Sequence, residues 1–220
     1  MVIDIKKLSY MVTKQEIIEA ALELFWETSY NNVGINTICK KANIQKGSFY
    51  HYFKSKDELA LDVLDLIWEQ KSAEMSEYFD DKSMTPINRL IFFGQKMTEQ
   101  SWIMLEEHGN FLGCPFGNFA LEMSTQNREV REKVDEVFKA KIKKVSELFE
   151  EAQEVGEIVK SVDAYELASL MNSCVQGASI ISKIRNDPTF IGKSVFMLLS
   201  AYIADPKLLE TKTFGEAKPG

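Results

Sequence analysis

The stretch "NIQKGSFYHYFKSKDEL", residues 43–59, decides how this chain is interpreted. It gathers three lysines, a histidine and four aromatic rings, and its acids come only at the end. From Lys40 to Lys56 there are five lysines and no acid, although the whole 220-residue chain has a formal net charge of -7. A local basic patch on an acidic body is what electrostatic capture of a polyanion requires. A merely solvated lysine face is the alternative from charge alone.

The residues on either side of Asn43 and Ile44 predict two short helices. One is expected over Gly34–Ala42 and the other over Lys46–Phe53, joined by three or four residues. This is the helix-turn-helix arrangement, whose second helix can enter the major groove of DNA. Its internal core is predicted to consist of Ile38, Ala42, Ile44, Phe49 and Phe53.

The polar side chains of the second helix sort by position. Lys46, Ser48 and Tyr50, beside Gly47, lie in its N-terminal half and are predicted to reach base edges. The phosphate candidates lie toward its end and the next helix start: His51, Tyr52, Lys54 and Lys56. A plain helical hairpin with a lysine-rich surface is the alternative, but Phe49–Tyr52 holds too many rings for an idle exposed helix.

The rest of the chain predicts an all-α fold with about nine helices. Apolar residues recur at helical spacing, and glycine and proline are scarce and clustered. Thr13 with Glu16 and Ser55 with Glu58 match capping boxes, the second opening a helix that continues to about Tyr78. We expect a DNA-binding domain over 1–58, a larger helical domain over 59–204, and a weakly ordered tail over 205–220.

The segment "INTICKKANIQKGSFYHYFKSKDEL" resembles the DNA-binding signature of the TetR family of bacterial transcriptional regulators. The matching positions are Lys46, Gly47, Ser48, Tyr50, Tyr52, Phe53, Ser55, Lys56 and Leu59, preceded by the first-helix positions Ile17, Ala20, Ala21, Leu24, Phe25 and Tyr30. The resemblance implies a ligand-responsive regulator, most often a repressor. Such a protein binds a near-palindromic double-stranded operator as a homodimer and is released by a small-molecule effector.

Two positions depart from the family pattern. Where the family often has a threonine pair, this chain has Val33 and Gly34, so Asn36 or Thr37 is the expected replacement phosphate contact. The recognition helix is preceded by Gln45, also a candidate DNA contact and a weaker cap than serine. Asn43 tolerates left-handed backbone geometry, so the turn is expected to form.

The resemblance also implies that the larger domain dimerises. Two apolar stripes, joined by "NDPTF", predict helices that would form a four-helix interface with a second chain. The interface candidates are Leu167, Leu170, Val175, Ala178, Val195, Leu198, Leu199 and Tyr202. A monomer that buries the same stripes internally is the alternative.

An effector pocket is predicted from the bulky, adaptable residues of the middle segment. Its candidates are Phe93, Met97, Trp102, Phe111, Cys114, Phe116, Phe119, Met123, Phe138, Met171 and Cys174. Gln176 and Asn172 would add polar selectivity. Core filling is the alternative for each apolar residue.

Cys114 stands between Gly113 and Pro115, just before a predicted helix. A helix N-terminus favours a thiolate, which is the nucleophilic form. Cys114 is therefore a candidate sensor of electrophiles or oxidants, with an inert buried thiol as the alternative.

Other classes of protein are disfavoured. His108 and Cys114 lack an orienting or oxyanion motif, so no catalytic site is predicted, and the histidine and cysteine spacing gives neither a metal site nor any other cofactor site. No run reaches the ~20 apolar residues of a membrane helix. Three scattered cysteines without a signal-peptide pattern predict a cytoplasmic protein. A helical adaptor that binds protein partners through the basic hairpin remains the alternative function.

Overall fold

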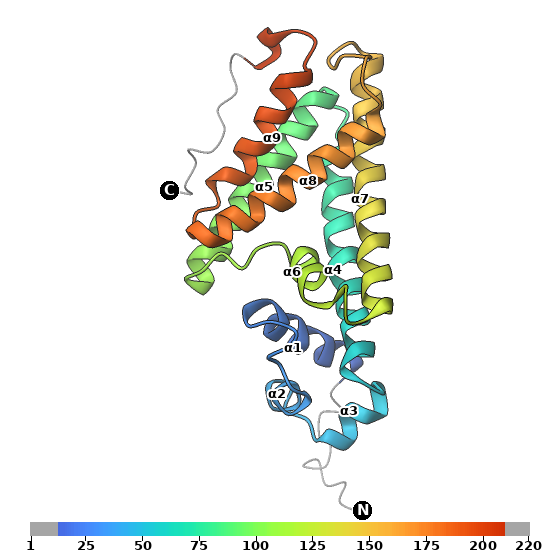
Figure 1. Cartoon of the computed structure of the whole chain (residues 1–220), viewed down its shortest axis with the longest axis vertical. Helices are drawn as coiled ribbons and strands as arrows, with labels where there is room; N and C mark the ends of the chain where they lie inside the picture. Colours follow the sequence, from blue (N-terminus) through green and yellow to red (C-terminus); the bar gives the residue numbers. More distant parts are fainter. Residues whose placement is uncertain (1–12, 210–220) are drawn as a thin grey trace, which may run out of the picture.

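The computed structural model describes residues 13–209, and these form nine α-helices and a short 3-10 helix (Figure 1). The predicted all-α class is confirmed. None of the helices in this described range combines the length and apolar character needed to cross a membrane. The elements are α1 (Lys14–Glu27), α2 (Ile35–Lys41), α3 (Lys46–Tyr52), α4 (Lys56–Phe79), α5 (Pro86–His108), α6 (Pro115–Met123), α7 (Arg128–Glu154), α8 (Ala164–Arg185), α9 (Thr189–Tyr202) and η2 (Pro206–Leu209).

The helix starts follow local sequence signals. Thr13 and Glu16 form the predicted capping box, in which each side chain accepts a hydrogen bond from the other residue's backbone N–H. Ser55 caps α4 by accepting from Glu58 N at 3.1 Å, but Glu58 accepts instead from Lys54 N at 2.7 Å. The Glu58 carboxylate thus bonds to the residue before the N-cap rather than to the N-cap itself. It thereby holds the backbone segment that leads into α4.

α1, α2 and α3 pack at one end of the molecule, against the start of α4 (Figure 1). Ile17, Ile38, Phe49 and Leu59 are fully buried in their shared core. This core does not stop at residue 58, the predicted domain boundary. It continues through Ala60, Val63, Leu64 and Ile67 of α4 and reaches Phe116, Phe119, Met123, Val130, Val134 and Val137 of α6 and α7. The small helical module is thus packed continuously onto the larger one.

α5, α7, α8 and α9 form the body at the other end, with α4 as the long link between the two ends (Figure 1). Helices α5 and α9 approach closely at two glycines. A Cβ on Gly192 would lie 2.5 Å from Thr98 Oγ1, and one on Gly94 would lie 3.1 Å from Val195 Cγ1. Any larger side chain at Gly192 would force the two helices apart.

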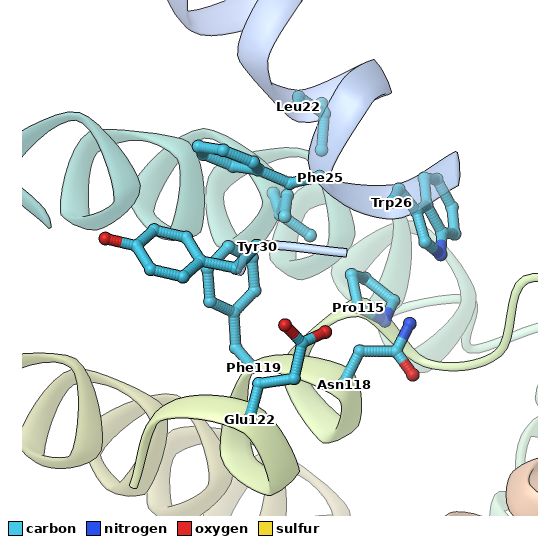
Figure 2. Close-up of a pocket in the computed structure, with 9 residues that line it drawn as sticks. Leu22, Phe25, Trp26, Tyr30, Pro115, Asn118, Phe119 and Glu122 are labelled. Carbon is cyan, nitrogen blue, oxygen red and sulfur yellow. The ribbon is translucent and has the colours of Figure 1, made fainter. Parts of the chain in front are cut away.

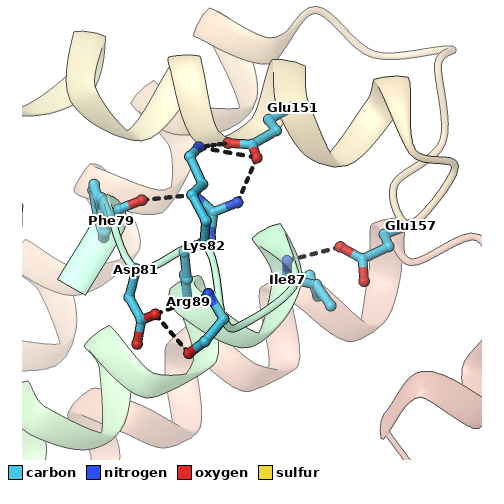
Figure 3. Close-up of polar contacts among 8 residues, drawn as sticks. Phe79, Asp81, Lys82, Ile87, Arg89, Glu151 and Glu157 are labelled. Carbon is cyan, nitrogen blue, oxygen red and sulfur yellow. Dashed lines mark hydrogen bonds and ion pairs between the residues drawn. The ribbon is translucent and has the colours of Figure 1, made fainter.

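A buried arginine ties the ends of α4, α5 and α7 together (Figure 3). The Arg89 guanidinium donates to the carbonyl oxygen of Phe79 and to Glu151 Oε1, each at 2.6 Å, and Lys82 also reaches Glu151. The hydrogen bond from Arg89 lowers the pKa of Glu151 below its ordinary value. Nearby, Glu157 accepts from Ile87 N at 2.9 Å and so caps the start of α5.

Backbone contacts hold the last described residues to the loop after α7. Ile203 forms an isolated antiparallel bridge with Ile158, and Ala204 N donates to Glu157 O at 2.9 Å. Residues 206–209, the first part of the predicted tail, form η2, and Leu209 packs against the large core. The remainder of the tail, 210–220, lies outside the described residues.

Candidate nucleic-acid interface and ligand cavity

Helix α3 has one buried side and one exposed side. Phe49 is fully buried beneath it, whereas Tyr50 is 53% exposed. Around Tyr50 the structure exposes most of the predicted DNA-binding residues of α2, α3 and the loops beside them: Asn36, Thr37, Gln45, Lys46, Gly47, Ser48, His51 and Lys54. Tyr52, half-buried, packs its ring edge-on against His51. The exposed residues among them all belong to α2, α3 and the adjoining loops, at one end of the molecule.

The turn between α2 and α3 has the geometry expected of Asn43. This residue adopts the left-handed conformation, with φ of 53°. Ile44 N donates to Cys39 O at 2.9 Å and Asn43 N to Lys40 O at 3.3 Å, which is the Schellman pattern of a helix end. Gln45 stands at the N-cap of α3 without a side-chain hydrogen bond, as its type predicts.

The five lysines between residues 40 and 56 divide into two groups. Lys41 pairs with Glu23 of α1. Lys56 donates to the carbonyl oxygens of Tyr30 and Val33 at 2.9 and 3.0 Å, and its ammonium lies 4.0 Å from the centre of the Tyr30 ring. Lys40, Lys46 and Lys54 are exposed and have no carboxylate partner within residues 13–209. These three supply the unpaired positive charge of the surface.

Lys56 also joins the loop after α1 to the start of α4. Its neighbour Asp57 accepts a hydrogen bond from the Tyr30 hydroxyl, and burial together with this contact raises the pKa of Tyr30. Burial lowers the pKa of Lys56. Two of the three N–H donors of the Lys56 ammonium bind carbonyl oxygens, so only the third is available for a phosphate. The phosphate contact of Lys56 stays a prediction.

The large domain holds a cavity of about 340 Å³ between α4, α5, α7 and α8. Five of the predicted pocket residues line it: Phe93, Met97, Phe111, Cys114 and Phe116. Phe111 is positioned by Asn186, the left-handed C-cap of α8, whose Oδ1 accepts from Phe111 N at 2.8 Å. The cavity is within the range of small-molecule sites.

The other predicted pocket residues lie elsewhere. Met171 lines a side space of about 30 Å³, and Phe138 shares a second cavity of about 160 Å³ with Cys114. Phe119 and Met123 are buried in the core shared with α1, and Cys174 packs on the core of the large domain. Trp102 is half-buried on α5 and lines none of the cavities described here. Core filling, the alternative reading, holds for Phe119 and Met123.

A polar network, not predicted from sequence, forms one wall of the 340 Å³ cavity. Glu74 accepts hydrogen bonds from Lys71 at 2.9 Å, from Tyr78 at 3.0 Å and from Gln100. Burial, with the Glu74 contact, raises the pKa of Tyr78 to about 12. Lys71, Glu74 and Tyr78 recur at positions i, i+3 and i+7 of α4. That polar face was the signal that sequence reasoning could have used.

The small helical module meets α6 at the junction shown in Figure 2. Trp26 Nε1 donates to Gly113 O at 3.1 Å, and Asn31 N donates to Glu122 Oε2 at 3.1 Å. The Phe25 and Phe119 rings meet edge-on with centroids 5.9 Å apart. The space among these residues is about 10 Å³, enough for about one water. This junction is a packed contact rather than a ligand site.

Most of the predicted dimer-interface residues are buried inside a single chain. Leu167, Val175, Ala178, Val195, Leu198 and Leu199 are each 8% exposed or less, and Tyr202 is half-buried. Only Leu170 is exposed, at 43%. The six buried side chains therefore form the protomer's own core, which corrects their assignment to a partner surface. The exposed apolar residues on α8 and α9 are instead Tyr165, Leu170, Ile180, Ile184, Phe190 and Met197.

A short helix-turn-helix with an exposed polar face, packed on a helical body with a small-molecule cavity, defines a class of protein. It is the class of helix-turn-helix transcriptional regulators with an attached ligand-binding domain.

Comparison with known proteins gives the family. The profile of "Bacterial regulatory proteins, tetR family" matches residues 17–63, and that of "Tetracyclin repressor-like, C-terminal domain" matches residues 96–195. The transcriptional regulator AcuR of Cereibacter sphaeroides is 32% identical over 176 residues, which cover 79% of this chain and 78% of that protein. The chain belongs to the TetR family, whose members are DNA-binding regulators rather than enzymes.

Two further relatives agree with this assignment. The transcriptional repressor DhaR of a Mycobacterium species is 27% identical over 174 residues, covering 79% of this chain and 84% of that protein. The crystal structure of regulatory protein TetR from Rhodobacter sphaeroides superimposes with a TM-score of 0.77 at 29% identity, covering 86% of this chain and 97% of that one.

Proposed function

We propose that this protein is a cytoplasmic, homodimeric repressor that binds a near-palindromic operator through α3 and is released by a small molecule in the 340 Å³ cavity. The observation that carries the proposal is the division of α3 into a buried Phe49 side and an exposed face with Lys46, Ser48 and Tyr50. Such a helix can insert its exposed face into a major groove while its buried face holds it to the protein.

The environment of Gly47 supports close approach of a duplex. A Cβ at this position would meet no atom within 4 Å, so no contact within the described chain requires glycine there. Glycine lets a ligand come close to a helix backbone. The exposed ammonium groups of Lys46 and Lys54 flank this point and would bind phosphates, as would Asn36 or Thr37 at the start of α2.

A homodimer is supported by the apolar side chains that α8 and α9 leave exposed. Ile184 is 75% exposed and Met197 is 60% exposed, and neither is covered by the described chain. Two copies packed through these helices form an isologous interface. The interface would hold two copies of α3 about 34 Å apart, or a multiple of that, on the two halves of the operator.

Release of the operator follows from the way α6 is held. Gly113 and Cys114, which lead into α6, line the cavity, and Gly113 O also accepts the Trp26 hydrogen bond. A ligand that moves this segment therefore moves α1, in addition to any tilt of α4. Repression, rather than activation, is supported by the relative DhaR, which is described as a repressor. A coupling of about 1–3 kcal/mol gives 5–150-fold release.

An electrophilic effector is a further part of the proposal, and Cys114 is its target. The thiol is half-buried and lines both the 340 Å³ and the 160 Å³ cavities, so a small reagent can reach it from either space. Replacing Cys114 by serine should abolish release by electrophiles and keep operator binding. Unaltered release in that variant would remove the thiol from the mechanism.

The proposal is tested by selecting bound sequences from a random duplex library and titrating the selected operator with salt. We expect a near-palindromic consensus and a slope of about -0.9 in log K per phosphate neutralised. Tyr50→Ala should lose the preference for the consensus and keep the oligomeric state. A protein with no duplex affinity would instead be an adaptor for protein partners. Retained specificity in Tyr50→Ala would show that a different surface reads the DNA.

A further inference from the structure

The residues that line the 340 Å³ cavity include both apolar and charged side chains. Its apolar wall is formed by residues such as Met75, Phe93, Met97, Phe111, Val175 and Ile191. Its charged groups come from α4 (Lys71, Glu74), α5 (Lys96, Glu107, His108) and α7 (Lys141). Which of these groups already has a partner decides what kind of ligand the cavity accepts.

Five of these six groups are paired or exposed. Lys71 and Glu74 satisfy each other within the α4–α5 network. Lys96 pairs with Glu99 at 2.7 Å. Glu107 and His108 are exposed in the last turn of α5, where water screens their charge, and His108 lies 3.3 Å from Glu27. These groups offer little charge to a buried ligand.

Lys141 is different. It is half-buried on α7 and lines both the 340 Å³ cavity and the adjoining 30 Å³ space. Its ammonium has no carboxylate or hydrogen-bond partner within residues 13–209. Its described contact is the Phe138 ring, whose centroid lies 5.9 Å away. An ammonium group has three donors and no acceptor, so the ligand group that pairs with it most strongly is an anion.

A second donor in the same cavity also lacks an acceptor. Gln176 Nε2 of α8 is buried and has no hydrogen-bond partner, while Gln176 Oε1 lies beside Gly117, 2.7 Å from where a Cβ would stand. An unsatisfied buried amide costs free energy unless a ligand supplies the acceptor. The residues that line this largely apolar space thus include one cation without a carboxylate partner, Lys141, and one buried N–H donor without an acceptor, Gln176 Nε2.

We propose that the effector that binds reversibly in this cavity is an amphipathic carboxylate, whereas electrophiles would act separately through Cys114. Its carboxylate pairs with Lys141, an oxygen accepts from Gln176 Nε2, and its hydrocarbon part lies against the apolar wall. The inference rests on the proposed function, because it assigns a ligand chemistry to the effector cavity. The cavity volume of about 340 Å³ lies at the lower end of the range for small-molecule sites, which suits a small organic acid.

The experiment measures calorimetric binding of the full chain, without DNA, to three matched series. The first series is the carboxylates from butyrate to decanoate together with benzoate. The second and third are the corresponding primary alcohols and primary amines. We expect the best carboxylate to bind at least tenfold more tightly than its alcohol. Absence of that preference throughout the series, or no binding of any carboxylate, overturns the proposal.

Variants assign the preference to Lys141. Lys141→Met keeps an unbranched side chain of nearly the same length and removes its charge, and should remove the preference for carboxylate while alcohol binding stays unchanged. Lys141→Glu should prefer the amine. The control is Lys143→Met on the same helix, where the side chain is 74% exposed and paired with Glu147, and it should bind as the wild type does. A preference that survives in Lys141→Met overturns the proposal.

Two readouts keep the tests separate. Thermal unfolding of Lys141→Met should be unchanged or shifted upward, because the lysine has no charged partner to lose. A marked downward shift would show a structural lysine and contradict the proposal.

Operator release is then measured with the best-binding carboxylate. If the carboxylate binds through Lys141 and leaves operator affinity unchanged, the regulatory function fails while the ligand class stands. If only neutral compounds release the operator, the ligand class fails while the function stands.

Discussion

Trp26 of α1 donates its indole N–H to the carbonyl oxygen of Gly113 across a distance of 3.1 Å, and Gly113 lines the ligand cavity. One hydrogen bond therefore joins the helix-turn-helix module directly to the wall of the 340 Å³ cavity, which is the proposed effector site. The bond is formed by residues 87 positions apart in sequence, and it lies at the packed α1–α6 junction (Figure 2).

Replacing Trp26 by phenylalanine should weaken the response to effector more than it weakens operator binding. The variant keeps an aromatic ring and loses a hydrogen bond whose net contribution is about 1 kcal/mol, a factor of about five in the coupling. The measurement is operator affinity with and without saturating effector. An unchanged ratio of the two affinities would show that the signal travels through α4 alone.

Gly47→Ala should have effects of opposite sign on stability and on DNA binding. Alanine is favoured over glycine within a helix by up to about 1 kcal/mol, and no atom blocks the new methyl group. The unfolding free energy should stay equal or rise, whereas operator affinity should fall at least tenfold because the methyl group occupies the space that the duplex would take. Denaturant unfolding and operator titration measure the two quantities. Undiminished affinity would place α3 farther from the DNA than we propose.

Lys56→Met and Lys54→Met form a matched pair. Lys56 spans the loop after α1 to α4 through two carbonyl contacts, so its loss should lower the unfolding free energy by about 2 kcal/mol. Lys54 is exposed, so its loss should leave stability unchanged and reduce the salt slope of operator binding by about 0.9. If Lys56→Met instead reduced the salt slope without a stability change, its third N–H would be shown to contact a phosphate.

Glu151→Gln should destabilise the protein in a pH-dependent manner. The variant leaves the buried Arg89 guanidinium without its charged partner. The expected cost at neutral pH is about 2–3 kcal/mol, below the usual 3–5 kcal/mol because Glu151 is one-third exposed. Since the pKa of Glu151 is lowered in the folded state, its contribution is complete above the ordinary glutamate pKa of about 4.3 and declines as pH falls below it.

The control for this effect is Glu150→Gln, an exposed neighbour on α7. Urea unfolding at neutral pH and at a series of acidic pH values measures the difference between each variant and the wild type. The difference for Glu151→Gln should shrink toward zero with acidification. A difference that is independent of pH would mean that the Glu151 carboxylate is not the source of the stability.

Ile184→Glu should convert the proposed dimer into a monomer. The Ile184 side chain is 75% exposed on α8, so a lone chain tolerates a charge there, whereas an apolar interface does not. Val155→Glu, at a position 60% exposed at the end of α7, is the control and should keep the oligomeric state. Sedimentation equilibrium distinguishes the two. A dimeric Ile184→Glu protein would locate the interface elsewhere.

The helix-turn-helix was predictable because its signals are local. Thr13 and Ser55 begin their helices through side-chain hydrogen bonds to nearby backbone, and Asn43 ends α2 with a left-handed residue. These contacts span three to five residues. The exposed face of α3 followed from the buried positions Phe49 and Phe53 by helical period alone.

The cavity and the interface were only partly predictable. Helical spacing identified Phe93 and Phe119 equally as apolar positions, yet Phe93 lines the cavity and Phe119 fills the core beneath α1. The stripe of Leu167, Val175 and Leu199 likewise looked suited to a partner, but it packs within the chain. An apolar face has the same period whichever surface covers it, so sequence alone does not choose between the two.

The sequence by itself determined an all-α chain with a short basic and aromatic helix near residue 50, because capping, turn geometry and helical period act over a few residues. Only the tertiary structure decided which lysines face outward, which aromatic residues enclose a cavity, and that Lys141 and Gln176 remain unpaired within it. Those outcomes depend on how α4, α5, α7 and α8 pack together. Contacts between residues far apart in sequence set that packing, and no local pattern encodes them.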